Sequence, residues 1–195
     1  MRGVIIWLAA IGLGLGLGVG SVAFLIVRGG AADARIGNGV WETERHAGDP
    51  ATDPYSRARV AIFGLWALPP EEVIYYTAYR DKDGAVLNRP CRYEVRGAAL
   101  PARWWSVTLY RDFFLIANEV RRYSWSKTAL DAGAAPWTIQ VNARGEGLHG
   151  LPMGDRDGVF ALSLRLYQPA KGVLERRGEI DLPEIVKLDC AGANT

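Results

Sequence analysis

Two adjacent tryptophans, Trp104 and Trp105, begin a run of strand-forming residues in the segment 102–110. Successive side chains of a strand point to opposite faces of the sheet, so the two indoles cannot enter the same core. One set of alternating residues predicts the core face and comprises Trp105, Val107 and Leu109. The opposite set comprises Trp104, Ser106, Thr108 and Tyr110. This second face needs a further layer of protein or a ligand to cover its aromatic side chains.

The segment 160–167 alternates in the same way, and its noncore face carries Ser163, Arg165 and Tyr167. If the two strands share a sheet, aromatic rings, an arginine and small hydroxyls would lie together on one surface. Such a surface could stack a sugar ring or hold an anion. The candidate ligand-binding residues are Trp104, Tyr110, Arg165 and Tyr167. The alternative, favoured because aromatic clusters usually pack, is coverage by the N-terminal helix or Trp41 with Arg165 paired to a carboxylate.

The hydrophobic period is two along most of the chain after residue 70, which predicts β-strands. The predicted strands are 72–80, 91–96, 104–111, 113–117, 137–142, 160–167 and 185–188. Many turn residues separate them, and the sequence Asp-Lys-Asp-Gly at 81–84 is typical of a hairpin. This pattern predicts a mainly β protein, an antiparallel β-sandwich of jelly-roll type.

One short amphipathic helix is predicted before the strands. Asp53 can cap it, Pro54 suits its first turn, and the Pro-Pro pair at 69–70 ends it. The residues predicted to share its apolar face are Tyr55, Ala58, Ile62, Leu65 and Trp66.

A stretch of 24 residues without charge, 4–27, lies between Arg2 and Arg28. This length suffices to cross a bilayer and exceeds the apolar region of a cleaved signal peptide, so an uncleaved signal anchor is predicted. We assign residues 1–28 to a single transmembrane anchor, 29–38 to a linker and 39–195 to one β-sandwich domain. The flanking charges do not decide the orientation. A three-residue tail before the span fits a bacterial inner-membrane protein with its C-terminal domain in the periplasm.

Gly12, Gly16 and Gly20 recur at a spacing of four within the anchor, so they share one helix face. Small residues at this spacing let a second helix approach closely, which predicts packing on another copy or on an envelope protein partner. The alternative is that glycine is simply common in membrane helices.

The sequence offers no recognisable catalytic or metal-binding motif. Its two histidines, His46 and His149, lack HxH or HExxH spacing, no CxxC occurs, and no serine lies in a GxSxG setting. The net charge is +2 with Lys and Arg scattered, so nucleic-acid binding is not expected. We therefore predict no catalytic residues, no metal and no cofactor.

Cys91 and Cys190 are both predicted on core-facing positions. An even cysteine count in an exported domain permits one disulfide between them. That bond would close a loop of about 100 residues and contribute up to about 4.7 kcal/mol of stability. Two separate buried thiols remain the alternative.

Several motifs resemble, in the same order, a family named domain of unknown function 1214. They are the segments 102–110, 115–118, 122–124 and 164–169, and the similarity extends over roughly residues 71–188. The helix at 53–58 and the glycine-rich anchor resemble the short, membrane-anchored bacterial members. The resemblance implies a β-sandwich, which in longer relatives is joined to a second uncharacterised domain, and it implies no known activity or cofactor. Many relatives have Asn-Trp-Leu-Pro where this chain has His149-Gly150-Leu151-Pro152, so a function of that aromatic loop is in doubt here.

The leading hypothesis is a noncatalytic, inner-membrane-anchored envelope protein whose periplasmic sandwich binds a partner or a small ligand. A second is an envelope hydrolase acting on a cell-wall or carbohydrate substrate, which requires Arg103, His149 or an aspartate to converge with a serine or a carboxylate. A third is a structural assembly module that oligomerises through the glycine-rich helix.

Overall fold

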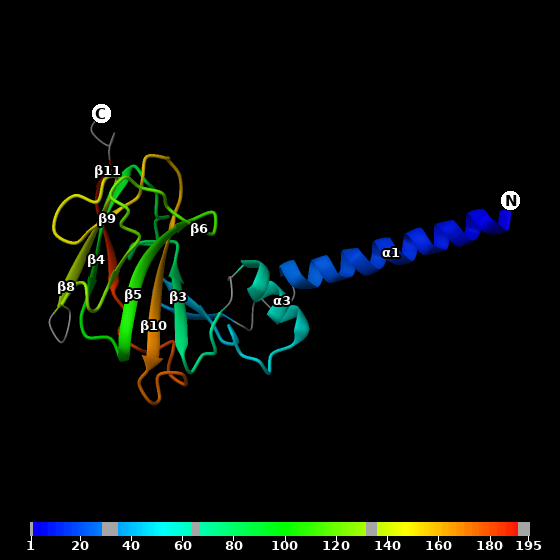
Figure 1. Ribbon diagram of the computed structural model, residues 1–195, viewed down its shortest axis with the longest axis horizontal. Coiled ribbons are helices and arrows are strands. Elements are labelled where there is room, and N and C mark those ends of the chain that lie inside the picture. Colours follow the sequence, from blue (N-terminus) through cyan, green and yellow to red (C-terminus); the bar gives the residue numbers. More distant parts are fainter. Residues whose placement is uncertain (1, 29–34, 64–66, 132–135, 191–195) are drawn as a thin grey trace.

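The computed structural model describes residues 2–28, 35–63, 67–131 and 136–190. A two-sheet β-sandwich forms the body of the molecule, and helix α1 (Arg2–Arg28) projects from it (Figure 1). Helix α3 (Pro54–Phe63) lies between the sandwich and α1 and contacts α1. The fold is therefore mainly β with one short helix and an apolar N-terminal helix, as the sequence predicts.

The first sheet contains seven strands, in the order β1, β2, β3, β10, β5, β6, with β7 also paired to β5. Their bounds are β1 Arg35–Asn38, β2 Trp41–Glu44, β3 Val73–Ala78, β10 Ala161–Pro169, β5 Ala102–Arg111, β6 Phe114–Leu115 and β7 Ser124–Ser126. The second sheet has the order β11 (Glu184–Cys190), β4 (Cys91–Gly97), β8 (Trp137–Asn142), β9 (Gly150–Pro152). All pairs are antiparallel except β8 with β9, which is parallel.

The core lies between the two sheets. Trp105 of β5 is 1% exposed and stacks on Trp137 of β8, with ring centroids 4.3 Å apart. Val107 and Leu109 point to the same interior. The alternation predicted for this strand is therefore confirmed, and the paired indoles join one sheet to the other.

Several strands differ from those predicted. Residues 35–38, which the sequence assigns to a linker, form β1 because they pair along their whole length with β2, Arg35 opposite Glu44. The strand predicted at 113–117 shortens to β6, since Asp112 and Phe113 both have positive φ and turn the chain into a hairpin. Strands β7 and β9, three residues each, were not predicted.

Helix α3 begins where the cap predicts. One carboxylate oxygen of Asp53 accepts hydrogen bonds from the backbone N–H groups of Tyr55 and Ser56, at 2.9 and 3.1 Å. Its hydrogen bonds, above all that from the Ser56 side chain, hold the pKa of Asp53 below its usual value. The predicted apolar face, however, is not buried: Tyr55 and Ile62 are exposed, and Leu65 and Trp66 lie outside the described residues.

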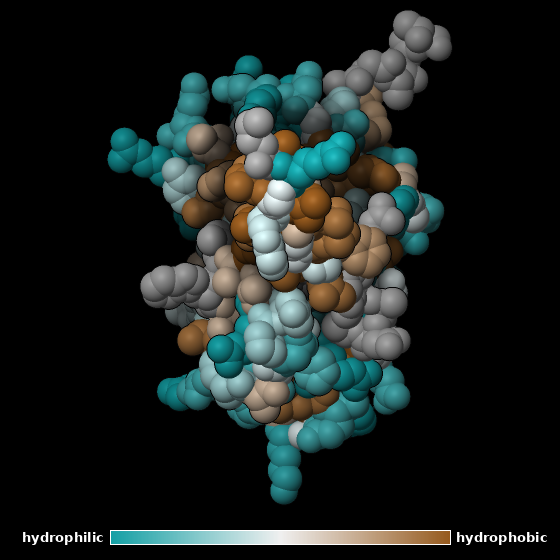
Figure 2. Space-filling model, turned by 90° about the vertical axis from the view of Figure 1, so that its right-hand side faces the viewer, coloured by the Kyte–Doolittle hydropathy of each residue, from teal (hydrophilic) through white to brown (hydrophobic). Residues whose placement is uncertain are grey.

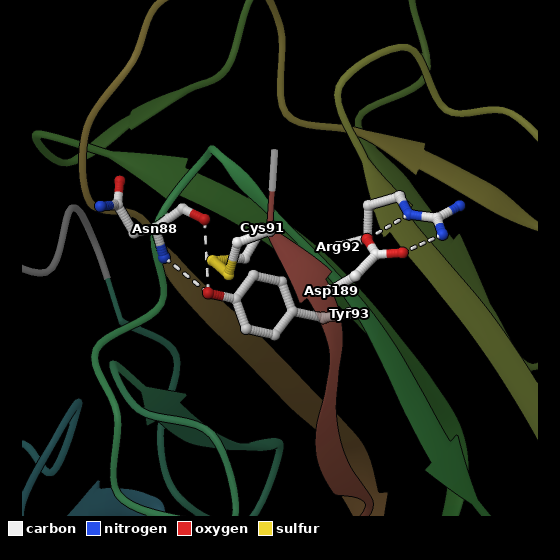
Figure 3. The surroundings of a disulfide bond; sticks show 6 residues. Asn88, Cys91, Arg92, Tyr93 and Asp189 are labelled. Carbon is white, nitrogen blue, oxygen red and sulfur yellow. Dashed lines mark hydrogen bonds and ion pairs between the residues drawn. A yellow bond between two sulfur atoms is a disulfide. The ribbon is translucent and has the colours of Figure 1, made fainter. Parts of the chain in front are cut away.

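A disulfide joins Cys91, the first residue of β4, to Cys190, the last residue of β11 (Figure 3). The two cysteines lie directly opposite each other in the register of the pair. Beside them, the Tyr93 hydroxyl accepts a hydrogen bond from the Asn88 N–H and donates one to the Asn88 carbonyl, and Arg92 pairs with Asp189. The bond thus fastens the edge strand β11 to its only described neighbour in the sheet.

The two tryptophans should differ in their contribution to stability. Trp105→Ala empties a core position and should lower the free energy of unfolding by about 3–5 kcal/mol. Trp104→Ala, its neighbour on the opposite, half-exposed face, should cost only about 1–2 kcal/mol. Urea denaturation of the full chain in nonionic detergent, followed by circular dichroism, measures both. Equal losses would contradict the assignment of the two faces.

Removal of the disulfide should destabilise the sandwich. Replacing both cysteines by serine opens a loop whose ends are 99 residues apart and should lower the free energy of unfolding by up to about 4.7 kcal/mol. The wild-type chain denatured in the presence of a reductant is the matched control and should lose the same amount. Alkylation of two free thiols in unreduced exported protein, detected by mass, would show that the bond does not form.

Candidate functional site

The outer face of the seven-stranded sheet gathers the side chains that the alternation of β5 and β10 directs away from the core. The register places Tyr167 opposite Trp104 and Arg165 opposite Ser106 on the neighbouring strand. On the other side of β10, Arg165 lies opposite Tyr75 of β3. The three strands thus form one continuous outer surface, with Arg165 on its central strand.

Hydroxyl groups hold the guanidinium of Arg165 in place. Its Nη1 donates to Thr108 Oγ1 at 3.1 Å, and its Nη2 donates to the Tyr110 hydroxyl at 2.5 Å. The guanidinium carbon lies 5.4 Å from the centroid of the Tyr110 ring and 6.0 Å from that of Tyr75, within cation–π range. The side chain is half-buried, and no carboxylate of the described residues lies within ion-pair distance of it. Two of its five N–H donors are used, so three remain.

A cavity of about 810 Å³ lies over this surface, between the sheet and α3. Residues of β3, β5 and β10 form its floor: Tyr75, Thr77, Tyr110, Ser163 and Arg165. Val60 of α3 and the loop residues Ala47 and Ala67 line it from above. Ligand pockets commonly measure about 300–1,000 Å³, so the cavity can hold a small organic molecule.

The other two described arginines that line the cavity are Arg35 and Arg111, and the guanidinium group of each is engaged by other groups of the protein. Arg35 pairs with Glu42 at 3.5 Å. Arg111 is only 8% exposed, directs its guanidinium to the carbonyls of Met153 and Val159, and has its pKa lowered by burial. Arg165 differs from Arg35 because it has no described carboxylate partner, and from Arg111 because it is less buried.

The four candidate ligand-binding residues fall into two pairs on this face. Tyr110 and Arg165 line the cavity and bond to each other. Trp104 and Tyr167 do not line it; their rings meet edge to face with centroids 5.1 Å apart. The Trp104 indole N–H also donates to Thr128 Oγ1 at 3.0 Å, so this pair packs within the protein.

Sequence reasoning missed the contribution of β3 and of the segments above the floor. Tyr75 and Thr77 carry the outward parity of a strand that was predicted, so the alternation could have nominated them. Nothing local indicates that β3 lies beside β10, because the two strands are separated by more than 80 residues of chain. The position of α3 over the sheet is likewise a long-range contact.

Of the residues on which a hydrolase would depend, Asp112 and Ser163 line the cavity, whereas His149 and Arg103 lie elsewhere. His149 Nδ1 is 3.1 Å from the Thr138 carbonyl, and its ring packs edge to face on Trp125. Arg103 donates to Gln168 Oε1 at 3.0 Å on the exposed surface. Neither residue lines the cavity, and no described hydrogen bond or ion pair joins either to a serine or a carboxylate. In the described parts of the chain, no group of three or more His, Cys, Asp or Glu could hold a metal ion.

The glycine face of α1 is open in the structure. No described atom lies within 4 Å of the positions that Cβ atoms would take at Gly12, Gly16 and Gly20, apart from the helix backbone itself. Packing of a second helix against this face stays a prediction.

The fold and the cavity define a β-sandwich domain with a ligand-sized hollow on the outer face of one sheet. The family described as "Protein of unknown function (DUF1214)" matches residues 72–171, about half of the sequence, and this chain belongs to that family. The matched residues include β3, β5 and β10, hence the floor of the cavity. Helix α1, strands β1 and β2 and helix α3 precede the match, and β11 follows it.

A solved structure from Vibrio parahaemolyticus shares the fold. The crystal structure of the VPA0106 protein from Vibrio parahaemolyticus is 25% identical in sequence, with a TM-score of 0.55 over 71% of this chain. The match covers 36% of that protein, so this chain corresponds to about a third of its length. An uncharacterised protein from Burkholderia cenocepacia matches at 15% identity and a TM-score of 0.38, over 90% of this chain and 42% of its own. No curated protein sequence matches significantly.

Proposed function

We propose that this chain is a noncatalytic, single-pass envelope protein of the bacterial inner membrane whose periplasmic sandwich binds a small anionic ligand over Arg165. One observation carries the proposal: on the floor of a cavity of about 810 Å³, the half-buried guanidinium of Arg165 is held, among the described residues, by neutral hydroxyls and by no carboxylate. Helix α1 supports the anchor, since its candidate span Arg2–Leu25 is 24 residues long and has a mean hydropathy of 2.1 over an 18-residue window, so it is long and apolar enough to cross a membrane.

The chemistry of Arg165 favours an anion as the ligand. A cation withdrawn partly from water loses hydration, and a hydroxyl dipole compensates less than an opposite charge does. An anionic group in the cavity could accept charge-assisted hydrogen bonds from the three remaining N–H donors. The hydroxyls of Thr108 and Tyr110 fix the guanidinium before the ligand arrives, which lowers the entropy cost of binding.

The cavity lining supports binding without catalysis. The described lining residues include no histidine and no cysteine. Of the three lining carboxylates, Glu42 is engaged by Arg35 and Asp112 by Arg156, and Glu44 likewise has a partner. Tyr110 and Thr108 are occupied in orienting the guanidinium. A further lining hydroxyl beside Arg165 is that of Ser163, and no described hydrogen bond joins it to a histidine or a carboxylate that could act as its base.

The disulfide supports a periplasmic location of the sandwich. Disulfides persist in oxidising compartments such as the periplasm and are rare in the bacterial cytosol. The bond between Cys91 and Cys190 ties the last strand to the sheet and so belongs to the folded domain.

Binding can be measured with a panel of small anions and their uncharged analogues. We expect benzoate or phenyl phosphate, but not benzyl alcohol, to bind the full chain in nonionic detergent by isothermal titration calorimetry. Arg165→Gln should weaken this binding at least about tenfold, because a charge-assisted pair is lost. Arg103→Gln removes an exposed arginine outside the cavity and is the matched control. Failure of every anion to bind, or equal binding by the Arg165→Gln variant, would contradict the proposal.

The orientation can be measured with reporters fused after Thr195. Alkaline phosphatase, which needs an oxidising compartment to form its disulfides, should be active in this position, and a cytoplasmic fluorescent reporter should be dark. The reverse result would place the sandwich in the cytoplasm.

A further inference from the structure

The cavity has a polar end and an apolar end. Arg165 and Tyr75 form the polar end, in the middle of the sheet, and Tyr110, the last residue but one of β5, extends it toward the end of that strand. Because β10 is antiparallel to both β3 and β5, the last residues of β3 and β5 lie beside the first residues of β10, at one end of the three strands. Just beyond these strand ends the cavity is lined by Asp112, which pairs with Arg156, and by four apolar residues, Tyr79, Val86, Phe113 and Val159, which we call the apolar rim.

The side chains of the apolar rim are more exposed to solvent than large apolar side chains usually are in a folded protein. Its four side chains are between 45% and 59% exposed. The positive φ of Asp112 and Phe113 forms the turn from β5 into β6 and places Phe113 on the rim. Phe114 follows on the same hairpin, is 73% exposed and does not line the cavity. Exposed apolar side chains beside a cavity are typical of a site that receives an apolar group.

The cavity lies on the side of the sandwich that faces the proposed membrane span. Helix α3 contributes to the cavity lining, contacts α1 and lies between α1 and the sheet (Figure 1). Seen from the side on which the N-terminus of α1 lies, the apolar helix α1 points toward the viewer, and hydrophobic residues lie at the centre of the view with hydrophilic residues above and below them (Figure 2). The exposed Tyr55 and Ile62 of α3 add apolar surface next to the span.

We infer that the ligand is an anionic amphiphile, with its carboxylate or phosphate on Arg165 and its hydrocarbon chain along the apolar rim. This inference rests on the proposed function and deepens it by naming the class of ligand. The head group would take two of the unused N–H donors of Arg165, and a planar carboxylate fits two parallel bonds from one guanidinium. Each methylene buried along the rim should strengthen binding about fourfold.

The binding experiment uses the full chain in nanodiscs of neutral phosphatidylcholine. The probe is dodecanoic acid that carries a photoactivatable diazirine near its methyl end, and its adducts are mapped by mass spectrometry. We expect adducts on the apolar rim and at least tenfold lower yield in the Arg165→Gln variant, with Arg103→Gln unchanged. Decanoate should compete far better than butyrate, and dodecyltrimethylammonium should not compete. Adducts spread over the sandwich with no effect of Arg165→Gln would overturn the inference.

A matched pair of variants on one hairpin tests the apolar rim. Phe113→Ser should weaken competition by decanoate several-fold and leave competition by butyrate unchanged, because only the longer chain reaches the rim. Phe114→Ser changes a neighbouring exposed phenylalanine outside the lining and should leave both unchanged. Equal losses in the two variants would overturn the role of the rim.

The results separate the two levels of the proposal. Competition by butyrate as strong as that by decanoate would retain the anion site and overturn the amphiphile. No competition by any carboxylate would overturn both. Addition of phosphatidylglycerol to the nanodiscs distinguishes the sources of the same chemistry, since a bilayer lipid that binds over Arg165 would displace the probe, whereas a site for free single-chain acids would keep it.

Discussion

The stacking of Trp105 on Trp137 is the contact on which the rest of the structure depends. It packs β5 against the opposite sheet and thereby fixes which face of β5 enters the core. Because side chains alternate along a strand, Thr108 and Tyr110 must then lie on the outer face. The pairing of β5 with β10 brings Arg165 to those two hydroxyls. The geometry of the candidate site is thus a consequence of core packing on the reverse side of the same strand.

The residues that line the cavity come from two different segments of the chain. Its floor belongs to the segment that matches the family, residues 72–171, whereas the α3 helix and β2 that complete its lining come from the preceding segment. The same preceding segment carries the proposed membrane span. The arrangement therefore joins a sheet surface within the segment that matches the family to a lining placed beside the proposed membrane span, which is where an amphiphile from a membrane would be encountered.

The sequence predicted those features that depend on local periodicity. The alternation placed Trp105 in the core and Arg165 on the outer face, and the Asp53 cap marked the start of α3. It could not predict which strands are neighbours, since pairing depends on contacts between distant segments. For that reason Tyr75 was missed, and the assignment of 35–38 to a linker was wrong at β1, which exists only through its pairing with β2.

The aromatic residues of the outer face show the same limit of what a sequence can predict. The alternation of side chains correctly placed all four candidate residues on one face of the sheet. Only the structure shows that Trp104 and Tyr167 pack against each other. It also shows that Tyr110 and Arg165 line the cavity. The alternative in which a carboxylate pairs with Arg165 finds no partner among the described residues. The distinction between packing and binding thus depended on distances of a few ångströms that no spacing in the sequence encodes.

The central claim is that Arg165 binds the anionic group of a ligand in this cavity. A crystal structure of the full chain with dodecanoate tests it most directly. The account predicts carboxylate oxygens within about 2.7–3.2 Å of the Arg165 guanidinium and the hydrocarbon chain against Phe113 and Val159. Density for the ligand elsewhere on the molecule, or a carboxylate of the protein paired with Arg165, would contradict the account.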